Sequence, residues 1–387
     1  MKRKNIALLL IGVTNENCGG AERFFANFFR VYRTNACAEH NLFFFTDERS
    51  LSILKKIGKL EQSINVVVLK NVSNRLKRAS ENLNLLKNIF LNRIDIIHVT
   101  SYGRNYYDRL KFAGSLPNFI RPKISVNIVD CEIPYVLSDD KSTKHIAYKL
   151  KYFPLFKEVK INGIFSWNEL FIKFVREKNF LKENVNLESA KTRFADTDGF
   201  VPSAKKENNI VFAARLTEQK RPLMFIDSVK ILANEYPQLI KDWKFFIYGK
   251  GVEEEKVKKL VIDYQLTQQI IIESTTDLKN VFALSKCFVS TQDYENFPSL
   301  SMNEAMSAGN AIVSRNVGQT NLFVNDGVNG YLAKEDTARG IAIAIKEYIS
   351  NEKNHVKMQD ESIRLTKDIH TPENFIKQID DFWNKLK

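Results

Sequence analysis

Short apolar segments alternate with longer amphipathic segments along this chain, and the alternation restricts the folds that it can adopt. Apolar runs of this length fit buried strands, and the stretches between them fit helical crossovers. Parallel sheets covered by helices have this pattern. The strands expected in the first half are residues 6–11, 42–45, 65–69, 95–99, 124–129 and 161–165, with helices at 21–32, 75–90 and 167–177.

A turn-rich segment separates this series from a second one, because residues 196–209 have the composition of a linker. We predict an α/β protein with two doubly wound, Rossmann-like domains that face a cleft. The expected domains are residues 1–203 and 204–370, followed by an amphipathic helix at 371–387. The second series comprises strands at 210–214, 243–248, 269–272, 287–291 and 311–314, the last closing the series, and helices at 222–235, 253–264, 276–284 and 299–308.

Composition excludes several other classes of protein. The chain has 387 residues, enough for two domains, and its 44% hydrophobic and 27% charged residues are typical of globular proteins. Gly12 interrupts the first apolar run, which lacks a cleavage pattern, so we expect a buried strand there and no signal peptide. Four scattered cysteines indicate neither a disulfide framework nor a zinc site. We expect a cytoplasmic protein without a membrane-spanning helix.

The net positive charge lies entirely in the first half of the chain. Residues 1–200 hold 33 Lys and Arg against 20 Asp and Glu, whereas the remaining residues hold 25 of each. This asymmetry favours contact with the inner face of an anionic membrane or with a phosphorylated acceptor; a solvated lysine-rich face is the alternative. No nucleic-acid-binding motif is present, so no such partner is expected. The basic residues considered are Arg75, Lys77, Arg78, Lys87, Lys149, Lys151, Lys157 and Lys160.

The most specific segment runs from Asp293 to Val313 and predicts an acidic loop, a helix and a strand. A helix beginning near Ser299 and Leu300 offers free N–H groups and a positive dipole end to a phosphate. Glu304 on this helix suits ribose hydroxyls, and Glu295 in the preceding loop suits sugar hydroxyls. The alternative for Glu304 is a capping box with Ser301.

Two further loops follow predicted strands of the second domain. Arg215 and Lys220 come after the first of these strands, where two cations suit a leaving diphosphate. An ordinary solvated loop is the alternative. Gly249 and Gly251 follow the next strand and permit close backbone approach to a nucleotide.

Together these motifs resemble family-four retaining glycosyltransferases of the GT-B fold, the glycosyl transferases group 1. The resemblance covers nearly the whole chain and is strongest from Ile210 to Leu332. It rests on Gly19-Gly-Ala-Glu-Arg23, Arg215 with Lys220, Gly249-x-Gly251, Glu304-Ala-Met-x-x-Gly309 and Asp326-Gly-x-x-Gly-Tyr-Leu332.

The resemblance implies a nucleotide-sugar donor, a UDP-sugar being expected, and a glycan or lipid-linked acceptor in surface polysaccharide synthesis. Arg215 and Lys220 would bind the diphosphate, Glu295 the transferred sugar and Glu304 the ribose. The loop of Gly19 and Gly20 would approach the donor phosphate and the acceptor. The leaving phosphate would act as base, without a metal or other cofactor, and the C-terminal helix would return to the first domain.

Two departures from the family pattern concern the transferred sugar. The paired glutamates of the family are eight positions apart, whereas Glu295 and Glu304 are nine apart. Either the loop has one extra residue or Asn296 shares the sugar-binding role. A His-Asp pair of the family is reduced here to Asp130. His98 is a weak substitute for the missing histidine, because a histidine at a strand end is more often structural.

Other interpretations remain open at this stage. Asp196-Thr-Asp198 matches a metal-binding pattern but lies in the linker, so we interpret it as a turn and predict no metal site. A nucleotide-sugar epimerase shares the predicted architecture. A non-catalytic partner subunit of a transferase would also have this architecture, and the two departures from the family pattern are the reason to consider it.

Overall fold

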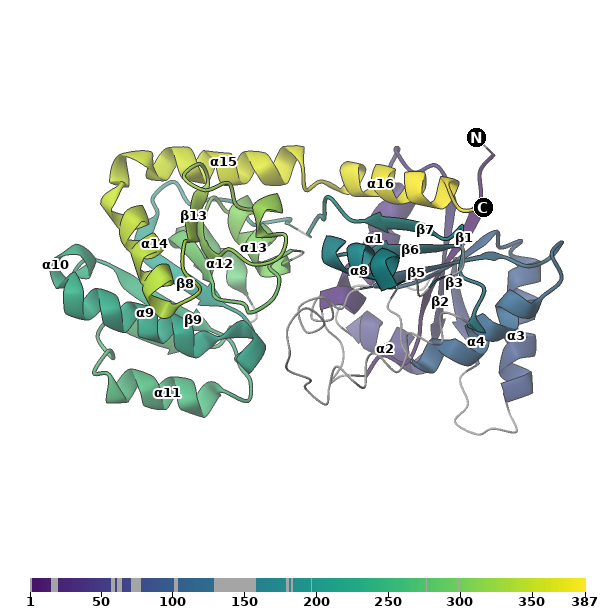
Figure 1. Cartoon of the computed structure of the whole chain (residues 1–387), viewed down its shortest axis with the longest axis horizontal. Coiled ribbons are helices and arrows are strands. Elements are labelled where there is room, and N and C mark those ends of the chain that lie inside the picture. The colour runs from purple at the N-terminus through teal and green to yellow at the C-terminus, as the bar shows by residue number, and fades with distance from the viewer. Residues whose placement is uncertain are drawn as a thin grey trace. The chain divides into compact units, whose positions relative to one another are not determined.

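A computed structural model describes residues 2–14, 20–56, 60, 65–70, 78–100, 104–128, 158–178, 181, 184–195, 197–275, 277–297 and 299–387. The chain forms two compact units (Figure 1). Unit 1 comprises Met1–Lys191 and Pro372–Lys387, and unit 2 comprises Thr192–Thr371.

Unit 1 contains a parallel sheet with the strand order β3-β2-β1-β4-β5-β6-β7. Its central strands are apolar and buried, as expected when helices cover both faces of a parallel sheet. The strands are β1 (Asn5–Leu10), β2 (Asn41–Asp47), β3 (Val66–Leu69), β4 (Ile96–Val99), β5 (Lys123–Ile128), β6 (Gly163–Ser166) and β7 (Asn186–Ser189). The helices are α1 (Gly20–Thr34), α2 (Glu48–Lys56), α3 (Arg78–Leu91), α4 (Arg104–Ser115), α8 (Glu169–Lys178) and α16 (Pro372–Asn384).

The last helix, α16, belongs to unit 1 although it is the end of the chain. Its apolar face is buried, and Phe375 lies against Phe28 of α1 with 5.3 Å between ring centroids. The Tyr32 hydroxyl donates a 2.5 Å hydrogen bond to Asp380, and the Lys4 ammonium donates to the backbone carbonyl of Trp383 at 2.8 Å. The amphipathic pattern of α16 therefore reflects packing on α1.

Unit 2 repeats the architecture with a parallel sheet of order β10-β9-β8-β11-β12-β13. Its strands are β8 (Glu207–Ala213), β9 (Lys244–Tyr248), β10 (Ile270–Glu273), β11 (Ser285–Ser290), β12 (Ala311–Arg315) and β13 (Gly330–Ala333). Its α-helices are α9 (Pro222–Glu235), α10 (Pro237–Ile240), α11 (Glu254–Asp263), α12 (Leu278–Leu284), α13 (Leu300–Ser307), α14 (Ala338–Ser350) and α15 (His355–Asp368). Short 3₁₀ helices lie at Glu218–Lys220 (η2), Thr320–Leu322 (η3) and Glu352–Asn354 (η4).

The prediction that residues 311–314 close the second sheet is wrong, because β13 pairs with β12 at the edge of the sheet. This strand has only four residues, and it begins with Gly330, where a Cβ would lie 1.8 Å from the carbonyl oxygen of Ile312. A glycine in so short a segment does not resemble a strand in sequence. The edge strand β7 was also missed, because it is polar and half-buried and therefore does not form an apolar run.

The division between the units lies at Lys191 and Thr192, before the expected boundary at residue 203. Residues 192–195 and 197–203 belong to unit 2, where the amide of Ser203 donates to the carbonyl of Ala283 at 3.1 Å. The amide of Phe200 donates to the carbonyl of Thr197 at 2.9 Å, so a turn forms where the linker was predicted. In the described part of the chain, no helix is long and apolar enough to cross a membrane.

Candidate functional site

The strand order of unit 2 creates a switch point between β8 and β11. From β8 the chain continues to β9 on one side, whereas from β11 it continues to β12 on the other. In parallel sheets the loops that follow such strands diverge and leave a crevice at the carboxyl ends, where ligands bind. The loops that follow β8 and β11 here contain residues 214–221 and 291–299. These loops carry five of the predicted site residues, namely Arg215, Lys220, Glu295, Asn296 and Ser299.

The β8 loop is fastened to the end of β11. Arg215 is exposed, and Lys220 ends η2 just before Arg221, whose φ of 50° turns the chain into α9. The Thr291 hydroxyl lies 2.9 Å from the carbonyl oxygens of both Lys220 and Arg221. The Lys220 ammonium donates to the side-chain oxygen of Gln292. The structure thus brings Lys220 to the loop that contains Glu295.

Two glycines of the β9 loop let the Arg215 loop lie directly on them. A Cβ on Gly249 would lie 1.9 Å from the carbonyl oxygen of Ala214, and one on Gly251 would lie 2.2 Å from that of Leu216. Both glycines thus let the backbone on either side of Arg215 lie close to the β9 loop, and their approach to a nucleotide stays a prediction.

Glu295 is almost completely buried, with 1% of its surface exposed. One carboxylate oxygen accepts hydrogen bonds from the amides of Phe297 at 3.0 Å and Gln319 at 2.6 Å. Gly318 leaves room for the other oxygen, which a Cβ there would approach to 2.2 Å. Burial raises the pKa of Glu295 to about 7, although the backbone donors oppose this shift by favouring the ionised form.

Asn296, the other candidate for the sugar-binding position, has a structural environment. Only 1% of its surface is exposed. Its side-chain nitrogen donates to the hydroxyls of Ser314 and Thr320, both at 2.8 Å, and its oxygen accepts a 2.6 Å hydrogen bond from the Ser290 hydroxyl. Because both polar ends of the amide are used within the protein, this conformation offers a sugar no group of the Asn296 side chain.

Helix α13 begins where the sequence predicted a phosphate site. Ser299 caps it by accepting a 3.3 Å hydrogen bond from the amide of Met302, and Leu300 is the first helical residue. Glu304 follows in the second turn and is half-buried. The capping box of Ser301 and Glu304 is not formed, since Ser299 is the cap and Met302 holds the third position. The capping-box alternative for Glu304 is therefore excluded.

Lys206 anchors α13 from its other end, which the sequence analysis missed. Its ammonium donates to the carbonyl oxygens of Phe282 at 3.1 Å, Ser285 at 2.6 Å and Ala308 at 2.7 Å. These carbonyls lie at the C-terminal ends of α12 and α13, where a cation complements the helix dipole. Burial lowers the pKa of Lys206 to about 7, and the three acceptors oppose this by stabilising the charged form.

Arg315 holds the loop after β11 in place and was also missed. Its guanidinium is 3% exposed and donates to the carbonyl oxygens of Gln292 at 2.8 Å and Asp293 at 2.9 Å, besides pairing with Asp336. An arginine that ends the otherwise apolar strand β12 was the available signal, because a buried charge needs partners.

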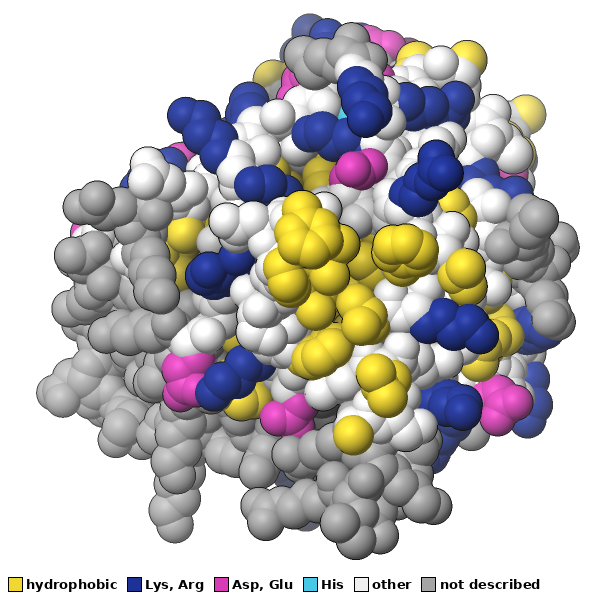
Figure 2. All heavy atoms as spheres, turned by 90° about the vertical axis from the view of Figure 1, so that its right-hand side faces the viewer, with side chains coloured by type: hydrophobic (Ala, Val, Ile, Leu, Met, Phe, Trp, Pro, Cys, Tyr) yellow, Lys and Arg dark blue, Asp and Glu magenta, His cyan; other side chains and the backbone are white. Residues whose placement is uncertain are grey.

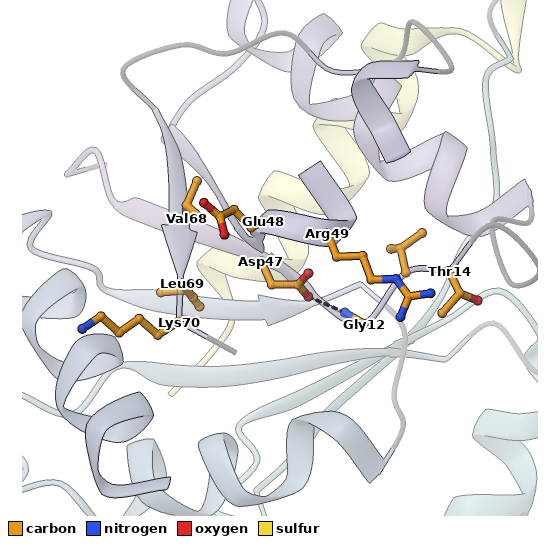
Figure 3. A pocket seen from close by; sticks show the side chains of 9 residues that line it. Gly12, Thr14, Asp47, Glu48, Arg49, Val68, Leu69 and Lys70 are labelled. Atoms are coloured by element: carbon orange, nitrogen blue, oxygen red, sulfur yellow. Dashed lines mark hydrogen bonds between the residues drawn. The ribbon is translucent and has the colours of Figure 1, made fainter. Parts of the chain in front are cut away.

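Unit 1 has a pocket of about 580 Å³ at the carboxyl ends of β1, β2 and β3 (Figure 3). The amide of Gly12 donates a 2.6 Å hydrogen bond to the carboxylate of Asp47, and this contact fixes the loop after β1 against β2. The lining contains two exposed cations, Arg49 and Lys70, beside the carboxylates of Asp47 and Glu48. Gly20 begins α1 after the loop that follows β1, whereas Gly19 and Asp130 lie outside the described residues.

His98 has the structural role that is usual for a histidine near a strand end. It is fully buried, its Nδ1 lies 2.9 Å from the Ser125 hydroxyl, and the indole N–H of Trp383 donates to the same nitrogen at 3.3 Å. Burial lowers the pKa of His98 to about 3, so the ring is neutral and supports the packing of α16. Within the described residues, no group of three or more His, Cys, Asp or Glu side chains is placed to hold a metal ion.

Residues 195–364 match the family model of glycosyl transferases group 1. This segment belongs to that family. It contains both loops of the unit 2 switch point, α13 and the Asp326–Leu332 motif, so the predicted family is confirmed over the part of the chain that carries these features.

Curated relatives match this chain over a limited length. A poly(glycerol-phosphate) alpha-glucosyltransferase of Bacillus subtilis is 28% identical over 178 residues, which are 46% of this chain and 25% of that protein. The GtfA subunit of a UDP-N-acetylglucosamine–peptide N-acetylglucosaminyltransferase of Streptococcus pneumoniae is 26% identical over 129 residues, 33% of this chain and 25% of that protein. The matched part of the chain thus spans about a quarter of the length of these relatives.

Solved structures match the entire chain. HepE of Anabaena, in complex with UDP and glucose, has a TM-score of 0.71 at 15% identity. The match covers 99% of this chain and 100% of the HepE chain. Pneumococcal GtfA, in complex with UDP and N-acetylglucosamine, has a TM-score of 0.69 at 13% identity, with both chains fully covered. These matches and the two parallel sheets confirm the predicted fold class, a GT-B protein with two doubly wound α/β units.

Proposed function

We propose that this chain is a retaining glycosyltransferase that moves a sugar from a nucleotide-sugar donor to a glycan or lipid-linked acceptor. One observation carries the proposal: at the β8–β11 switch point, Lys220 contacts the loop of buried Glu295, and that loop leads into the capped N-terminus of α13. The group 1 family of this segment and the two glycosyltransferases named above as relatives support it.

Different residues of unit 2 would bind different parts of the donor. Arg215, Lys220 and the free N–H groups at the start of α13 would neutralise the diphosphate as it leaves. Glu304 would hold the ribose hydroxyls, and the loop of Glu295 would hold the transferred sugar. We propose UDP as the nucleotide, since complexes of similarly folded proteins contain it.

The proposed reaction needs charge stabilisation more than a separate acid and base. The bond between C1 of the sugar and the diphosphate breaks, and a bond from C1 to the acceptor oxygen forms on the same face. The acceptor proton passes to the leaving diphosphate. The protein therefore contributes positioning and cations, with no metal required.

The pocket of unit 1 is the proposed acceptor site. Its cations Arg49 and Lys70 suit an acceptor that carries phosphate. The relative that is named a poly(glycerol-phosphate) glucosyltransferase supports an acceptor of this class. We propose that Gly19, Gly20 and Asp130 serve the junction between acceptor and donor, as the family resemblance implies.

Calorimetric titration of the purified chain with UDP tests the donor site. We expect Lys220→Ala and Glu304→Ala to weaken UDP binding about tenfold or more. Lys357→Ala, at an exposed position on α15, is the matched control. Undiminished UDP binding by Glu304→Ala would argue against the ribose role.

Turnover assays then separate the proposed activity from its alternatives. A panel of UDP-sugars is incubated with the chain alone, with and without a phosphate-bearing glycan. Conversion of the donor into another UDP-sugar without acceptor indicates an epimerase. Absence of turnover despite UDP binding indicates a non-catalytic partner subunit.

A further inference from the structure

We propose that the amino-terminal edge of the unit 1 sheet is a docking surface for an anionic lipid membrane. This edge carries an unusual set of exposed apolar side chains, shown in Figure 2 as a yellow patch among blue basic side chains. We call it the apolar patch, and it consists of Leu83, Phe90, Leu91 and Phe119.

The apolar patch comes from two adjacent elements. Leu83 and Phe90 are seven residues apart on α3 and therefore share one face of that helix. Leu91 is the last residue of the same helix. Phe119 lies in the connection that precedes β5. Phe119 is 87% exposed, Phe90 is 71% exposed, and Leu83 and Leu91 are each 64% exposed. Side chains of this size normally bury most of their surface, so this exposure indicates an interaction site.

A groove of about 760 Å³ lies beside the patch and joins it to a basic rim. Phe90, Phe119 and Leu386 are among the apolar residues of its lining. The lining also contains five cations and a single carboxylate, Asp95, whose oxygen accepts a 2.8 Å hydrogen bond from the amide of Asn5. The five cations, called the basic rim here, are Lys2, Lys4, Arg93, Arg121 and Lys123.

The combination of patch and rim selects the occupant. A second copy of the chain would bring an identical set of five cations against the rim, and these would repel each other. An anionic bilayer offers hydrocarbon for the aromatic side chains and phosphate for the cations at the same surface. The excess of 33 basic over 20 acidic residues in positions 1–200 adds long-range attraction to such a surface.

Docking on a membrane through the apolar patch also leaves the unit 1 pocket open. The basic rim precedes or begins β1, β4 and β5, at the amino ends of these strands, whereas the pocket of Arg49 and Lys70 lies at the carboxyl ends of the neighbouring strands. In a parallel sheet these are opposite edges. Docking by the apolar patch therefore leaves the proposed acceptor pocket uncovered by the membrane. Of the basic residues considered from the sequence, exposed Lys87 lies on α3 between Leu83 and Phe90.

Vesicle co-sedimentation of the full chain tests this proposal. Vesicles of phosphatidylcholine alone are compared with vesicles that also contain phosphatidylglycerol, over a series of NaCl concentrations. We expect binding to the anionic vesicles only, decreasing as salt rises. Phe90→Ser/Phe119→Ser is expected to weaken the partition coefficient about tenfold or more, because two aromatic anchors are lost. Arg93→Glu/Lys123→Glu is also expected to weaken it about tenfold.

Matched controls lie in unit 2. Val252→Ser/Val356→Ser removes two equally exposed apolar side chains, and Lys353→Glu/Lys357→Glu reverses two exposed cations. Both controls should retain vesicle binding.

Recovery of the wild type in the supernatant with both vesicle types, or binding that the patch variants leave unchanged, overturns the proposal. Sedimentation velocity gives the remaining outcome: self-association that Phe90→Ser/Phe119→Ser abolishes would assign the patch to a second copy. UDP titration of the same variants should be unchanged, so this test is independent of the proposed activity.

Discussion

Unit 1 and unit 2 are built in the same way, yet they present different chemistry at their edges. Each has a parallel sheet with a switch point, between β1 and β4 in unit 1 and between β8 and β11 in unit 2. In unit 2 the buried Arg315 fixes the loop that follows β11, at the carboxyl ends of the strands. In unit 1 polar contacts also hold α16, and five cations line a groove at the amino ends of the strands.

Together the two proposals assign two kinds of recognition to one architecture. A small charged ligand is bound best by cations whose positions are fixed before binding, which unit 2 provides through its hydrogen-bonded loops. A broad anionic surface requires many exposed cations but little precision, and unit 1 has such a distribution. The following predictions test whether unit 2 is rigid and chemically specific and unit 1 is held mainly by packing.

The largest effect is expected from Lys220→Ala. Its ammonium contacts Gln292 in the loop of Glu295, so removing it takes a positioned charge from the proposed diphosphate site. We expect kcat/KM to fall about 100- to 1,000-fold in a glycosyl-transfer assay. Lys191→Ala in unit 1, an exposed lysine 3.7 Å from Glu169, should change it less than about twofold. Equal losses in both variants would remove the special role of unit 2.

The next effect concerns the pH dependence of stability. The pKa of Glu295 is raised from 4.5 to about 7, so the folded protein binds this proton more tightly than the unfolded chain does. Stability from this group is fully present below about pH 4.5 and is lost as pH rises to about 7, a change of about 3 kcal/mol. Urea unfolding followed by fluorescence of Trp243, which lies in unit 2, measures this change.

Glu295→Gln should remove that part of the pH dependence, because the amide does not titrate. Glu255→Gln is the control, since its side chain is 88% exposed. A wild-type profile that stays unchanged in Glu295→Gln would show that this carboxyl is already ionised throughout the range.

A pair of glycine substitutions in unit 2 is expected to have the next largest effect. Gly318 and Gly327 both have positive φ, +54° and +74°, so alanine is strained at both positions. A Cβ on Gly318 would also lie 2.2 Å from the Glu295 carboxylate, whereas nothing lies within 4 Å of one on Gly327. We expect Gly327→Ala to cost about 1 kcal/mol and Gly318→Ala about 2 to 3 kcal/mol in urea unfolding. Equal costs would mean that the Glu295 loop yields easily.

The sequence predicted the strands that are continuous and apolar, and it failed where a tertiary contact decides the structure. Residues 6–11 predict β1 because an unbroken apolar run suits a strand buried on both faces. Helix α2 was missed because Glu48–Lys56 begins directly after β2, without a separating turn. The edge strand β13 depends on close approach to Ile312, which a single sequence does not reveal.

The candidate site divides in the same way. The motif around Arg215 and Lys220 was recognisable because cations directly after a buried strand lie at the carboxyl edge of a sheet. The anchoring role of Lys206 was not, because its three acceptors are backbone carbonyls, and every residue has one. The spacing of the glutamates left Asn296 as a sugar-binding candidate, and only the contacts of its amide show a structural role.

The smallest effect is expected in unit 1, from Tyr32→Phe. This change removes the hydroxyl that donates to Asp380 at 2.5 Å and leaves a buried carboxyl with one fewer donor. Because burial already raises the pKa of Asp380 to about 6, the loss should cost about 1 to 2 kcal/mol, mostly above that pH, where the carboxylate is charged. Tyr107→Phe removes a similar hydrogen bond to Glu158 at an exposed site and should cost less than about 0.5 kcal/mol. Urea unfolding followed by the fluorescence of Trp167 and Trp383 measures both, since α16 carries Trp383 and unit 1 also holds Trp167. A larger cost for Tyr32→Phe than for Gly318→Ala would reverse the ranking and show that polar contacts, more than aromatic packing, keep α16 on unit 1.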